Sequence, residues 1–535
     1  MTMNPTAGTT SARSTFLFDE IDTPDRNVLG GKGSGLARMV RMGLPVPDGF
    51  VIGTASGREY LREGAISAQL REEVRTQIGH LEERSGSGFG DADAPLLVSV
   101  RSGAPVSMPG MMDTILNCGL TRVSAATLAE QTSNHHFAYS SYERLLHSFA
   151  VTVRGISESV VEELLLDCNF GTDPLVGLHG RCDALEQLIE RETGAPFPDA
   201  WGQLDEAIEA VFKSWTSRRA VAYRRHKGIS DEVGTAIVIQ RMVFGNRGED
   251  SCSGVAFTRD PATGASGAYG EVLFNAQGED VVDGSHDADP LPTLGVQLPE
   301  AMTDLEKAMD ALERDYRDMC DIEFTVEQGK LWILQTRVGQ RSGRAAVKLA
   351  MAMLDEGLID RKEALSRVSD DQFEAAQAPV LESVEDDRIF ARGLAASPGA
   401  AVGPVTFDPD KCTEYARAGT PAVLIRPTTS PADMPGIIES AAVVTGRGGR
   451  TSHAAVVARG LNKPSVCGVG AVERVGSNTD DIAQALIAGQ LITEGDIVSV
   501  DGDLGLVVRG AATLLAATTD DALARFGRLR DTGAH

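Results

Sequence analysis

One histidine lies in a glycine-rich segment whose residue types suit covalent phosphoryl chemistry. The run Thr-Gly-Arg-Gly-Gly-Arg-Thr-Ser-His occupies residues 445–453 and leads into an apolar run of helical pattern. Thr451 or Ser452 can cap that helix, so we expect His453 in its first turn. A helix N-terminus disfavours imidazolium and attracts a phosphoryl dianion, and the paired glycines leave room for phosphate. The alternative is a histidine packed beneath a helix cap.

The segment 321–337 has the pattern of a β-hairpin with one polar face. Gly329 supplies the positive φ that such a turn needs. With a three-residue bulged loop, residue 323 opposes residue 333 and residue 321 opposes residue 335. In that register one face carries Asp321, Glu323, Gln335 and Arg337. A two-residue loop would instead place Glu323 and Gln335 on opposite faces.

The polar face predicted for this hairpin has the composition of a magnesium and phosphate site. Carboxylate and amide oxygens suit Mg²⁺ that also binds phosphate, and arginine suits phosphate itself. The alternative is an exposed polar face that lies opposite a core of Ile322, Phe324 and Val326.

Two further cations lie in segments that suit phosphate binding. Lys32 lies in the run Leu-Gly-Gly-Lys-Gly-Ser-Gly-Leu at 29–36, which predicts a flexible glycine-rich turn but matches neither a P-loop nor a dinucleotide fingerprint. Arg101 follows a strand predicted at 96–100 and begins a loop rich in Pro, Gly and Met. Backbone N–H groups, an ammonium and a guanidinium all bind phosphate oxygens. The alternatives are a tight turn with a solvated lysine and an ordinary surface loop.

The hydrophobic pattern predicts the elements that position these residues. Residues 120–230 are mostly of helical pattern, and a second β-rich block runs from 235 to the hairpin. Residues 340–388 are charged and helix-prone, which favours a solvated connector. From 395 to about 510, short strands accompany one compact helix, and a helical tail completes the chain.

Composition restricts the classes of partner. The chain has 535 residues, which predicts three or four domains, and its formal net charge of −26 disfavours nucleic acids and anionic membranes as partners. The seven cysteines form no CxxC pair, so we expect a reduced, cytoplasmic protein without a disulfide framework. We find neither a signal peptide at residues 1–13 nor an apolar run long enough to span a membrane.

Taken together and in this order, the motifs resemble the pyruvate, phosphate dikinase family and its relatives, the phosphoenolpyruvate synthases and rifampicin phosphotransferases. The likeness spans about residues 16–505, and Met-Pro-Gly-Met-Met-Asp-Thr at 108–114 favours the dikinase branch. The other segments that carry it are Leu-Gly-Gly-Lys-Gly (29–33), Ser-Val-Arg-Ser-Gly (99–103), Gly-Val-Ala-Phe-Thr-Arg-Asp-Pro-Ala-Thr-Gly (254–264), Asn-Ala-Gln-Gly-Glu-Asp (275–280), Leu-Gln-Thr-Arg (334–337) and the run around His453 (448–460).

The resemblance implies a multidomain α+β and α/β fold without a TIM barrel. We expect an ATP-grasp nucleotide-binding domain with a helical insert at about 120–230, followed by a swivelling phosphohistidine β/α domain. The expected boundaries are a disordered lead at 1–15, the ATP-grasp domain at 16–340, a helical linker at 341–390, the phosphohistidine domain at 391–510 and a tail at 511–535.

The resemblance also implies a reaction. In the family, ATP phosphorylates the histidine, inorganic phosphate takes up the γ-phosphoryl group, and AMP and pyrophosphate leave. Carried over to this sequence, His453 is the phosphoryl carrier. Lys32 and Arg101 hold the ATP phosphates, and Arg337 contacts the phosphates being transferred.

The remaining assignments concern the metal, the base and regulation. Glu323 and Gln335, with Asp321 as a weaker candidate, are expected at Mg²⁺. Gln240 and Met242 lie on a strand that resembles the adenine-binding hinge, and Glu279 lies in a loop near the nucleotide. Thr451 matches a threonine that a regulatory kinase modifies in some family members.

Two features depart from the family pattern. Arg450 stands where dikinases usually have Met. This cation stabilises phosphohistidine, contacts an altered acceptor or is merely solvated. The family's pyruvate- and phosphoenolpyruvate-binding barrel needs about 250 residues, whereas only 30 follow residue 505. We therefore expect the barrel to be absent and the acceptor, pyruvate or another molecule, to be bound by a separate protein.

Three functions compete on these grounds. The first is a half-dikinase that makes phosphohistidine from MgATP and inorganic phosphate. The second is a phosphotransferase that acts directly on a small molecule, of the rifampicin phosphotransferase or phosphoenolpyruvate synthase type. The third is a non-catalytic, nucleotide-responsive regulatory protein. A homodimer is one option for the oligomeric state.

Overall fold

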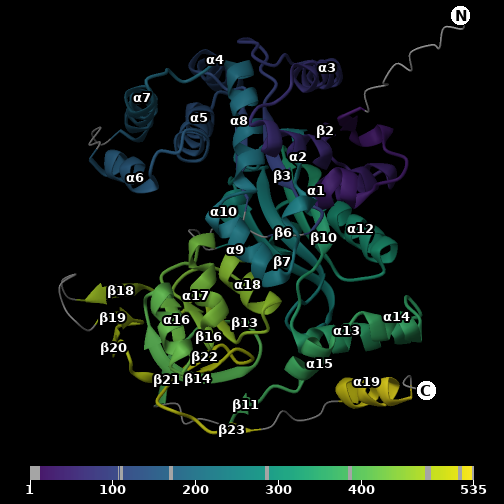
Figure 1. Ribbon diagram of the computed structural model, residues 1–535, viewed down its shortest axis with the longest axis vertical. Coiled ribbons are helices and arrows are strands. Elements are labelled where there is room, and N and C mark those ends of the chain that lie inside the picture. Colours follow the sequence, from purple (N-terminus) through teal and green to yellow (C-terminus); the bar gives the residue numbers. More distant parts are fainter. Residues whose placement is uncertain are drawn as a thin grey trace, which may run out of the picture. The chain divides into compact units, whose positions relative to one another are not determined.

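The computed structural model describes residues 13–532 except for 107, 109–111, 168–172, 283–287, 383–387, 476–482 and 516–520. The chain divides into two compact units, Met1–Met242 and Val243–His535, whose residues can be followed by colour in Figure 1. The boundary falls inside the stretch predicted as one ATP-grasp domain. Most of the predicted lead, part of the motif at 108–114 and Cys168 lie outside the described residues.

The first unit contains an antiparallel five-stranded sheet in the order β1-β2-β5-β3-β4 among its described residues. Its strands β2 and β5 are almost wholly buried, because helices α1 and α8 pack against the sheet. The strands are β1 (Thr15–Leu17), β2 (Gly49–Ile52), β3 (Val98–Gly103), β4 (Thr114–Cys118) and β5 (Ala236–Arg241). The strand predicted at 96–100 is thus confirmed as β3, and β1 begins at the end of the predicted lead.

Helices make up most of the rest of the first unit. The prediction that residues 120–230 are mostly helical is confirmed, and the starts of these helices carry strong caps. Thr121 and Ser124 form a reciprocal capping box, and Asp173 caps a helix that has Pro174 at its first position. The helices are α1 (Arg26–Arg41), α2 (Thr54–Glu63), α3 (Ala68–Ser85), α4 (Arg122–Thr132), α5 (His135–Ser148), α6 (Glu158–Asp167), α7 (Pro174–Thr193), α8 (Ala200–Ser214) and α9 (Arg218–Lys227).

The second unit begins with another antiparallel sheet, in the order β10-β9-β6-β7-β8. Every residue of β6 is buried, as expected for a strand near the centre of a sheet. The strands are β6 (Cys252–Arg259), β7 (Ser266–Phe274), β8 (Asp289–Pro290), β9 (Cys320–Glu327) and β10 (Lys330–Val338), and the helices are α10 (Gly278–Val282), α11 (Pro292–Gln297) and α12 (Pro299–Tyr316).

The hairpin of β9 and β10 has the predicted composition but a different register. Lys330 pairs with Glu327, so the loop has two residues, and both Gln328 and Gly329 have positive φ. The predicted three-residue loop is therefore wrong. A β-bulge between Ile333 and Gln335 inserts one residue and brings Gln335 opposite Glu323. The bulge restores the shared polar face that a plain two-residue loop would have split.

The stretch predicted as a solvated connector contains a buried helix. Helix α13 (Gly343–Asp355) buries eight of its residues and lies at the centre of a hydrophobic cluster. Helices α14 (Arg361–Ser366), α15 (Asp370–Ala376) and α19 (Asp521–Asp531) pack on it, and Phe526 of α19 is fully buried there. The solvated-connector prediction is wrong for α13, although the helical prediction is confirmed.

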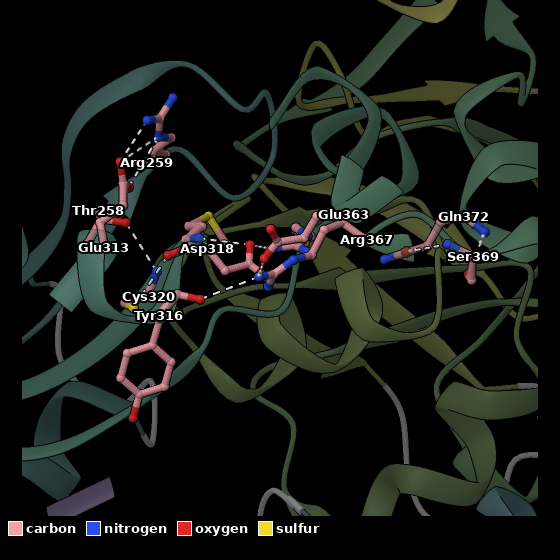
Figure 2. Close-up of polar contacts among 12 residues, drawn as sticks. Thr258, Arg259, Glu313, Tyr316, Asp318, Cys320, Glu363, Arg367, Ser369 and Gln372 are labelled. Atoms are coloured by element: carbon pink, nitrogen blue, oxygen red, sulfur yellow. Dashed lines mark hydrogen bonds and ion pairs between the residues drawn. The ribbon is translucent and has the colours of Figure 1, made fainter. Parts of the chain in front are cut away.

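Ion pairs also hold this helical layer to the rest of the second unit. Arg367 of α14's C-terminal end pairs with Glu363 and with the buried Asp318, which precedes β9 (Figure 2). Arg259 of β6 bonds both Glu313 of α12, at 2.7 Å, and the carboxylate after α13. Buried arginine–carboxylate pairs are costly to break singly, so α13 and α14 are part of the folded unit.

The third structural part, also within the second unit, is a mixed eight-stranded sheet in the order β12-β22-β21-β14-β15-β16-β17-β13. Strands β14 to β17 run parallel, with helices at their crossovers, and the other pairings are antiparallel. The strands are β12 (Ile389–Arg392), β13 (Leu394–Ser397), β14 (Ala400–Thr406), β15 (Val423–Arg426), β16 (Ala442–Thr445), β17 (Ser465–Cys467), β21 (Ile497–Asp501) and β22 (Leu506–Arg509).

The helices of this part are α16 (Pro409–Arg417), α17 (Met434–Glu439) and α18 (His453–Gly460). The prediction of one compact helix is therefore wrong in number, and α18 is the helix that was expected. Small ribbons complete the part: β18 (Val472–Val475), β19 (Gln484–Ile487) and β20 (Gln490–Thr493) form one, and β11 (Val380–Leu381) pairs with β23 (Leu514–Leu515) in another. We call residues 388–515 the carrier.

The molecule is thus a mixed α/β multidomain protein, and its described sheets include no TIM barrel. The six described cysteines are all free and buried. Within the described stretches, helices that are both long and apolar enough to cross a bilayer are lacking.

Candidate functional site

The reactive candidate His453 is the first residue of α18, as the capping pattern predicts. Ser452 occupies the N-cap position, but its side chain makes no capping hydrogen bond. The imidazole is largely buried, and its Nδ1 lies 3.3 Å from Oγ1 of Thr429. Its Nε2 is buried and has no hydrogen-bond partner. When Nδ1 carries the proton and donates to Thr429, Nε2 keeps its lone pair for a phosphoryl group.

Burial lowers the pKa of His453 below its ordinary value of 6.5, and the nearby carboxylate of Asp433 opposes that shift. The sequence predicted a neutral imidazole because of the helix N-terminus. The direction is the same in the structure, where the loss of water around the ring lowers the pKa. A neutral ring at pH 7 is the form that can act as a nucleophile.

A strand residue that the sequence did not single out meets the loop before His453. The carboxylate of Glu271, on β7, accepts hydrogen bonds from the backbone N–H of Arg450 at 2.7 Å and of Thr451 at 3.2 Å, and also from the Thr451 hydroxyl. A Cβ on Gly449 would overlap this carboxylate. In this arrangement the space beside Gly449 holds a carboxylate of the protein, and room there for a phosphate stays a prediction.

Thr451 is consequently only 3 % exposed. Its predicted role as a site of modification stays a prediction, and in this arrangement its hydroxyl donates to Glu271. Arg450 donates through Nη1 to the hydroxyl of Tyr269, two residues before Glu271 on the same strand, at 2.5 Å. Arg450, where the sequence departs from the family pattern, thus contacts Tyr269 of β7.

The hairpin brings its four predicted polar residues together in two cross-strand pairs. Nε2 of Gln335 donates to Oε1 of Glu323 at 2.7 Å, and Nε of Arg337 donates to Oδ2 of Asp321 at 2.8 Å. Asp321 is 2 % exposed, and desolvation raises the pKa of its carboxyl, with Glu323 adding to the rise and Arg337 opposing it. The cluster is present as predicted, although the register that makes it was not.

The strand pairing extends these pairs into two rows across one face of the sheet. Glu323 pairs with Val255, which pairs with Glu271. Asp321 pairs with Phe257, which pairs with Tyr269. Cross-strand partners share a face, so the four polar hairpin residues and the two residues that touch the carrier loop lie on the same face. We call this the polar face of the sheet.

In the first unit, the glycine-rich segment around Lys32 is helical. It lies in α1, which is interrupted at Gly30, where φ is 68°. A Cβ on Gly30 would overlap the carbonyl oxygen of Gly103, and the N–H of Gly31 donates to Ala104 at 2.9 Å. The prediction of a flexible turn is therefore wrong. The glycines let α1 approach the end of β3, two residues after Arg101.

The other predicted nucleotide residues occupy varied environments. Gln240 is buried in β5, and its amide nitrogen donates to the carbonyl of Pro47 at 3.0 Å. The N–H of Met242 donates to Leu97 at 2.9 Å. Glu279 is exposed on α10. Lys32, Arg101, Gln240 and Met242 belong to the first unit, and the remaining candidates belong to the second.

Two matches to known families cover most of the chain. Residues 26–358, in the segments 26–86, 62–294 and 295–358, match the family described as "Pyruvate phosphate dikinase, AMP/ATP-binding domain". Residues 419–505 match "PEP-utilising enzyme, mobile domain". The chain belongs to the pyruvate, phosphate dikinase family.

Curated relatives agree with this assignment. The chain is 42 % identical over 513 residues to pyruvate, phosphate dikinase of Rhizobium meliloti (strain 1021), covering 92 % of this chain and 57 % of the relative. It is 40 % identical over 513 residues to that of Clostridium symbiosum, with 93 % and 58 % covered. It is 42 % identical over 535 residues to that of Giardia intestinalis, with 96 % and 60 % covered. The chain thus spans less than two thirds of the length of these dikinases.

The dikinase family uses Mg²⁺ with ATP, so the residues present must be compared with that need. Within the described stretches, groups of three or more His, Cys, Asp or Glu positioned for a metal ion are lacking. The pair of Glu323 and Gln335 offers hard oxygen ligands nonetheless. Mg²⁺ in nucleotide enzymes typically takes one or two protein oxygens and completes its shell with phosphates and water. The polar face therefore fits magnesium that arrives with ATP.

Proposed function

We propose that this chain carries out the ATP half-reaction of a dikinase. The phosphoryl group next to AMP moves from ATP to Nε2 of His453, the γ-phosphoryl group moves to inorganic phosphate, and AMP and pyrophosphate leave. The observation that carries the proposal is the state of His453. Its ring is buried and of lowered pKa, with Nδ1 beside a hydroxyl and Nε2 without a partner.

The proposed roles of the other residues follow the family likeness and the chemistry of each side chain. Glu323 and Gln335, with Asp321 as a weaker candidate, would hold Mg²⁺, which neutralises charge on the phosphates. Lys32, Arg101 and Arg337 would position the phosphates. Phosphoryl transfer depends chiefly on such positioning and charge neutralisation.

An ATP-grasp arrangement is part of the same proposal. Gln240, in β5, and Met242, directly after β5, would then lie along the adenine ring, and Glu279 would lie near the nucleotide. The side-chain nitrogen of Gln240 is already bonded to Pro47. Any contribution of this residue to adenine binding would therefore come from its backbone or its amide oxygen.

The carrier would then deliver the phosphoryl group to an acceptor held elsewhere. The dikinase name of the relatives makes pyruvate the first acceptor to test, bound by a separate protein. The support is chemical: a covalent phosphohistidine divides one transfer into two, so donor and acceptor need not meet.

The test is a half-reaction assay on the purified chain. MgATP labelled at the β-phosphate is added with and without inorganic phosphate, and AMP, pyrophosphate and acid-labile, base-stable protein label are followed. We expect phosphate-dependent AMP formation and label in the wild type, and no label in His453→Ala. His80→Ala, at an exposed histidine of α3, is the matched control and should label normally.

Three outcomes would contradict the proposal. Label in His453→Ala equal to that of the wild type would place the chemistry on another residue. MgATP binding without AMP or label in the wild type would favour a nucleotide-responsive regulatory protein. Label that moves directly to an added alcohol or 2-oxo acid, with no second protein, would favour the small-molecule phosphotransferase.

A further inference from the structure

Arg459 of α18 is a buried cation whose hydrogen-bonding capacity is largely unused. It is 1 % exposed. Its Nη1 donates to the carbonyl of Ala396 at 2.8 Å, while Nε and Nη2 have no partner. Burial lowers the pKa of this guanidinium, which reflects the cost of keeping a charge away from water. A buried charge with unmet donors destabilises a fold unless another interaction offsets it.

The guanidinium of Arg459 stands over the polar face of the sheet. Its Cζ lies 5.9 Å from the ring centroid of Phe257, and Cζ of Arg450 lies 5.7 Å from that of Tyr269. Phe257 and Tyr269 are cross-strand partners in the row that ends at Asp321. The two arginines of the carrier that flank His453 in sequence therefore rest on neighbouring positions of one row.

Asp321, the cross-strand partner of Phe257 in this row, has an acceptor atom without a partner. Its Oδ2 accepts from Arg337, but its Oδ1 is buried and has no partner. Asp321 is also one of the acidic groups that act electrostatically on Arg459. Two donor nitrogens and one carboxylate oxygen, all without a partner, thus belong to groups of opposite charge on facing surfaces. Meeting them, directly or through water, would strengthen the docked arrangement.

From this geometry we propose that Arg459 is a positioning residue for the phosphorylation of His453. Its guanidinium lies over the ring of Phe257 and can donate a hydrogen bond to Oδ1 of Asp321. These two interactions fix the position of α18 on the polar face. His453 begins the same helix, and a shift of α18 moves its Nε2 by a similar amount. The inference rests on the proposed function, because it concerns the step in which ATP phosphorylates His453.

A purely structural role makes a different prediction. The bond from Arg459 to Ala396 ties α18 to β13, and under a purely structural role Arg459 only keeps the carrier folded. In that case its loss would impair every reaction of His453. A positioning role impairs only the reaction that needs α18 on the polar face.

The experiment uses two phosphoryl donors on the full chain. MgATP labels His453 only when α18 is docked correctly. Phosphoramidate reacts with an accessible imidazole: its P–N bond breaks, ammonia leaves, and an Nε2–P bond forms without the sheet. Initial rates of labelling by both donors are measured for the wild type, Arg459→Met and Arg459→Lys, together with the Kd for MgATP.

The matched control is Arg509→Met. Arg509 is also an arginine of the carrier placed over an aromatic ring, with Cζ 4.7 Å from the Phe390 centroid, but it belongs to β22 and bonds Gln490 and Leu491. Its substitution should leave both labelling rates within about twofold of the wild type, because small rim contacts contribute little.

For Arg459→Met we expect labelling by MgATP to slow by about tenfold to a hundredfold, since a misplacement of about 1 Å costs up to that much. Labelling by phosphoramidate and the Kd for MgATP should stay within about twofold. Arg459→Lys should recover part of the loss, because it keeps the charge but not the planar fork.

Three results would overturn the inference. Arg459→Met that labels normally from MgATP would show that Arg459 does not position α18. Equal loss of labelling from both donors would assign it a structural role. A wild type that labels from phosphoramidate but never from MgATP would defeat the proposed function, and this inference with it; the first two results would leave the proposed function intact.

Discussion

At the scale of single residues, the contacts of His453 assign different tasks to its two ring nitrogens. Nδ1 lies within hydrogen-bonding distance of the Thr429 hydroxyl, and Nε2 has no hydrogen-bond partner. Thr429 was missed by the sequence analysis because it lies 24 residues earlier, in a loop with no motif of its own. Glu271 was missed for the same reason: an isolated acid on a strand has no signature until the strand pairing places it. By contrast, His453 itself could be predicted, since its cap, glycines and helix are contiguous.

The hydroxyl of Thr429 should hold the imidazole in the tautomer that leaves Nε2 free. Thr429→Val keeps the shape of the side chain but removes the acceptor for Nδ1–H. A net hydrogen bond contributes about 1 kcal/mol, which corresponds to roughly a fivefold change in rate. We expect ATP-dependent labelling of His453 to fall by about that factor in a rapid-quench time course. Thr420→Val, at an exposed threonine, should have no effect, and an equal fall there would contradict the assignment.

The pH dependence should follow the lowered pKa of His453. Burial lowers the pKa of the ring below 6.5, so the rate of ATP-dependent labelling should fall to half of its plateau only below pH 6.5. Removing the opposing carboxylate, in Asp433→Asn, should lower the pKa further and move the acid limb to lower pH.

The same shift affects stability. The unfolded chain binds the proton more readily than the folded chain, so the free energy of unfolding should decrease as the pH falls below about 6.5. A labelling rate that already halves above pH 6.5 would argue that the ring is not desolvated in solution.

At the scale of elements, the contact between the loop before α18 and β7 depends on a glycine. Gly449→Ala places a methyl group on the Glu271 carboxylate, so we expect the three hydrogen bonds of that carboxylate to be lost and ATP-dependent labelling to slow by about tenfold. In a Glu271→Ala background the same substitution should cost almost nothing, because nothing remains to displace. Additive effects in the double variant would disprove the contact. Gly79→Ala, where a Cβ meets open space, is the control.

Two elements show where local pattern falls short of the structure. The hairpin turn could be read from Gly329, but the bulge between Ile333 and Gln335 leaves no mark in the sequence, so its register could not. Around Lys32, several glycines lower helix propensity by about 1 kcal/mol each, which favoured a turn. Tertiary packing reverses this: a Cβ on Gly33 would lie 2.7 Å from Val51, and only a glycine-rich helix fits so close to the sheet.

At the scale of the whole molecule, membership of the dikinase family was predictable and the role of the middle helices was not. The motifs predicted this family likeness, which the matches at residues 26–358 and 419–505 confirm. The charged flanks of helix α13 favour a solvated connector, whereas its own residues are mainly Ala, Met, Leu and Val. Its partner α19 lies far along the chain, and no local sequence pattern predicts that the two helices pack together.

The cluster of α13 and α19 should contribute strongly to stability. Phe526→Ala removes a fully buried ring and should lower the free energy of unfolding by about 3–5 kcal/mol, measured by denaturant titration. Arg528→Ala, at an exposed position of the same helix, should leave the midpoint nearly unchanged. A small effect of Phe526→Ala would mean that α19 detaches readily from α13.

The pairing of α13 with α19 also sets an order of events during synthesis. Leu523 and Phe526 cover an apolar surface that is made about 170 residues earlier. At roughly 5–20 residues per second, that surface waits about 10–30 s on the ribosome for its cover. The intervening residues build the carrier, and β11, which precedes it, pairs with β23 at its C-terminal end. All residues of the carrier are therefore synthesised before the helical layer of α13 and α19 is complete. A chaperone that shields apolar helices can bind α13 during that interval.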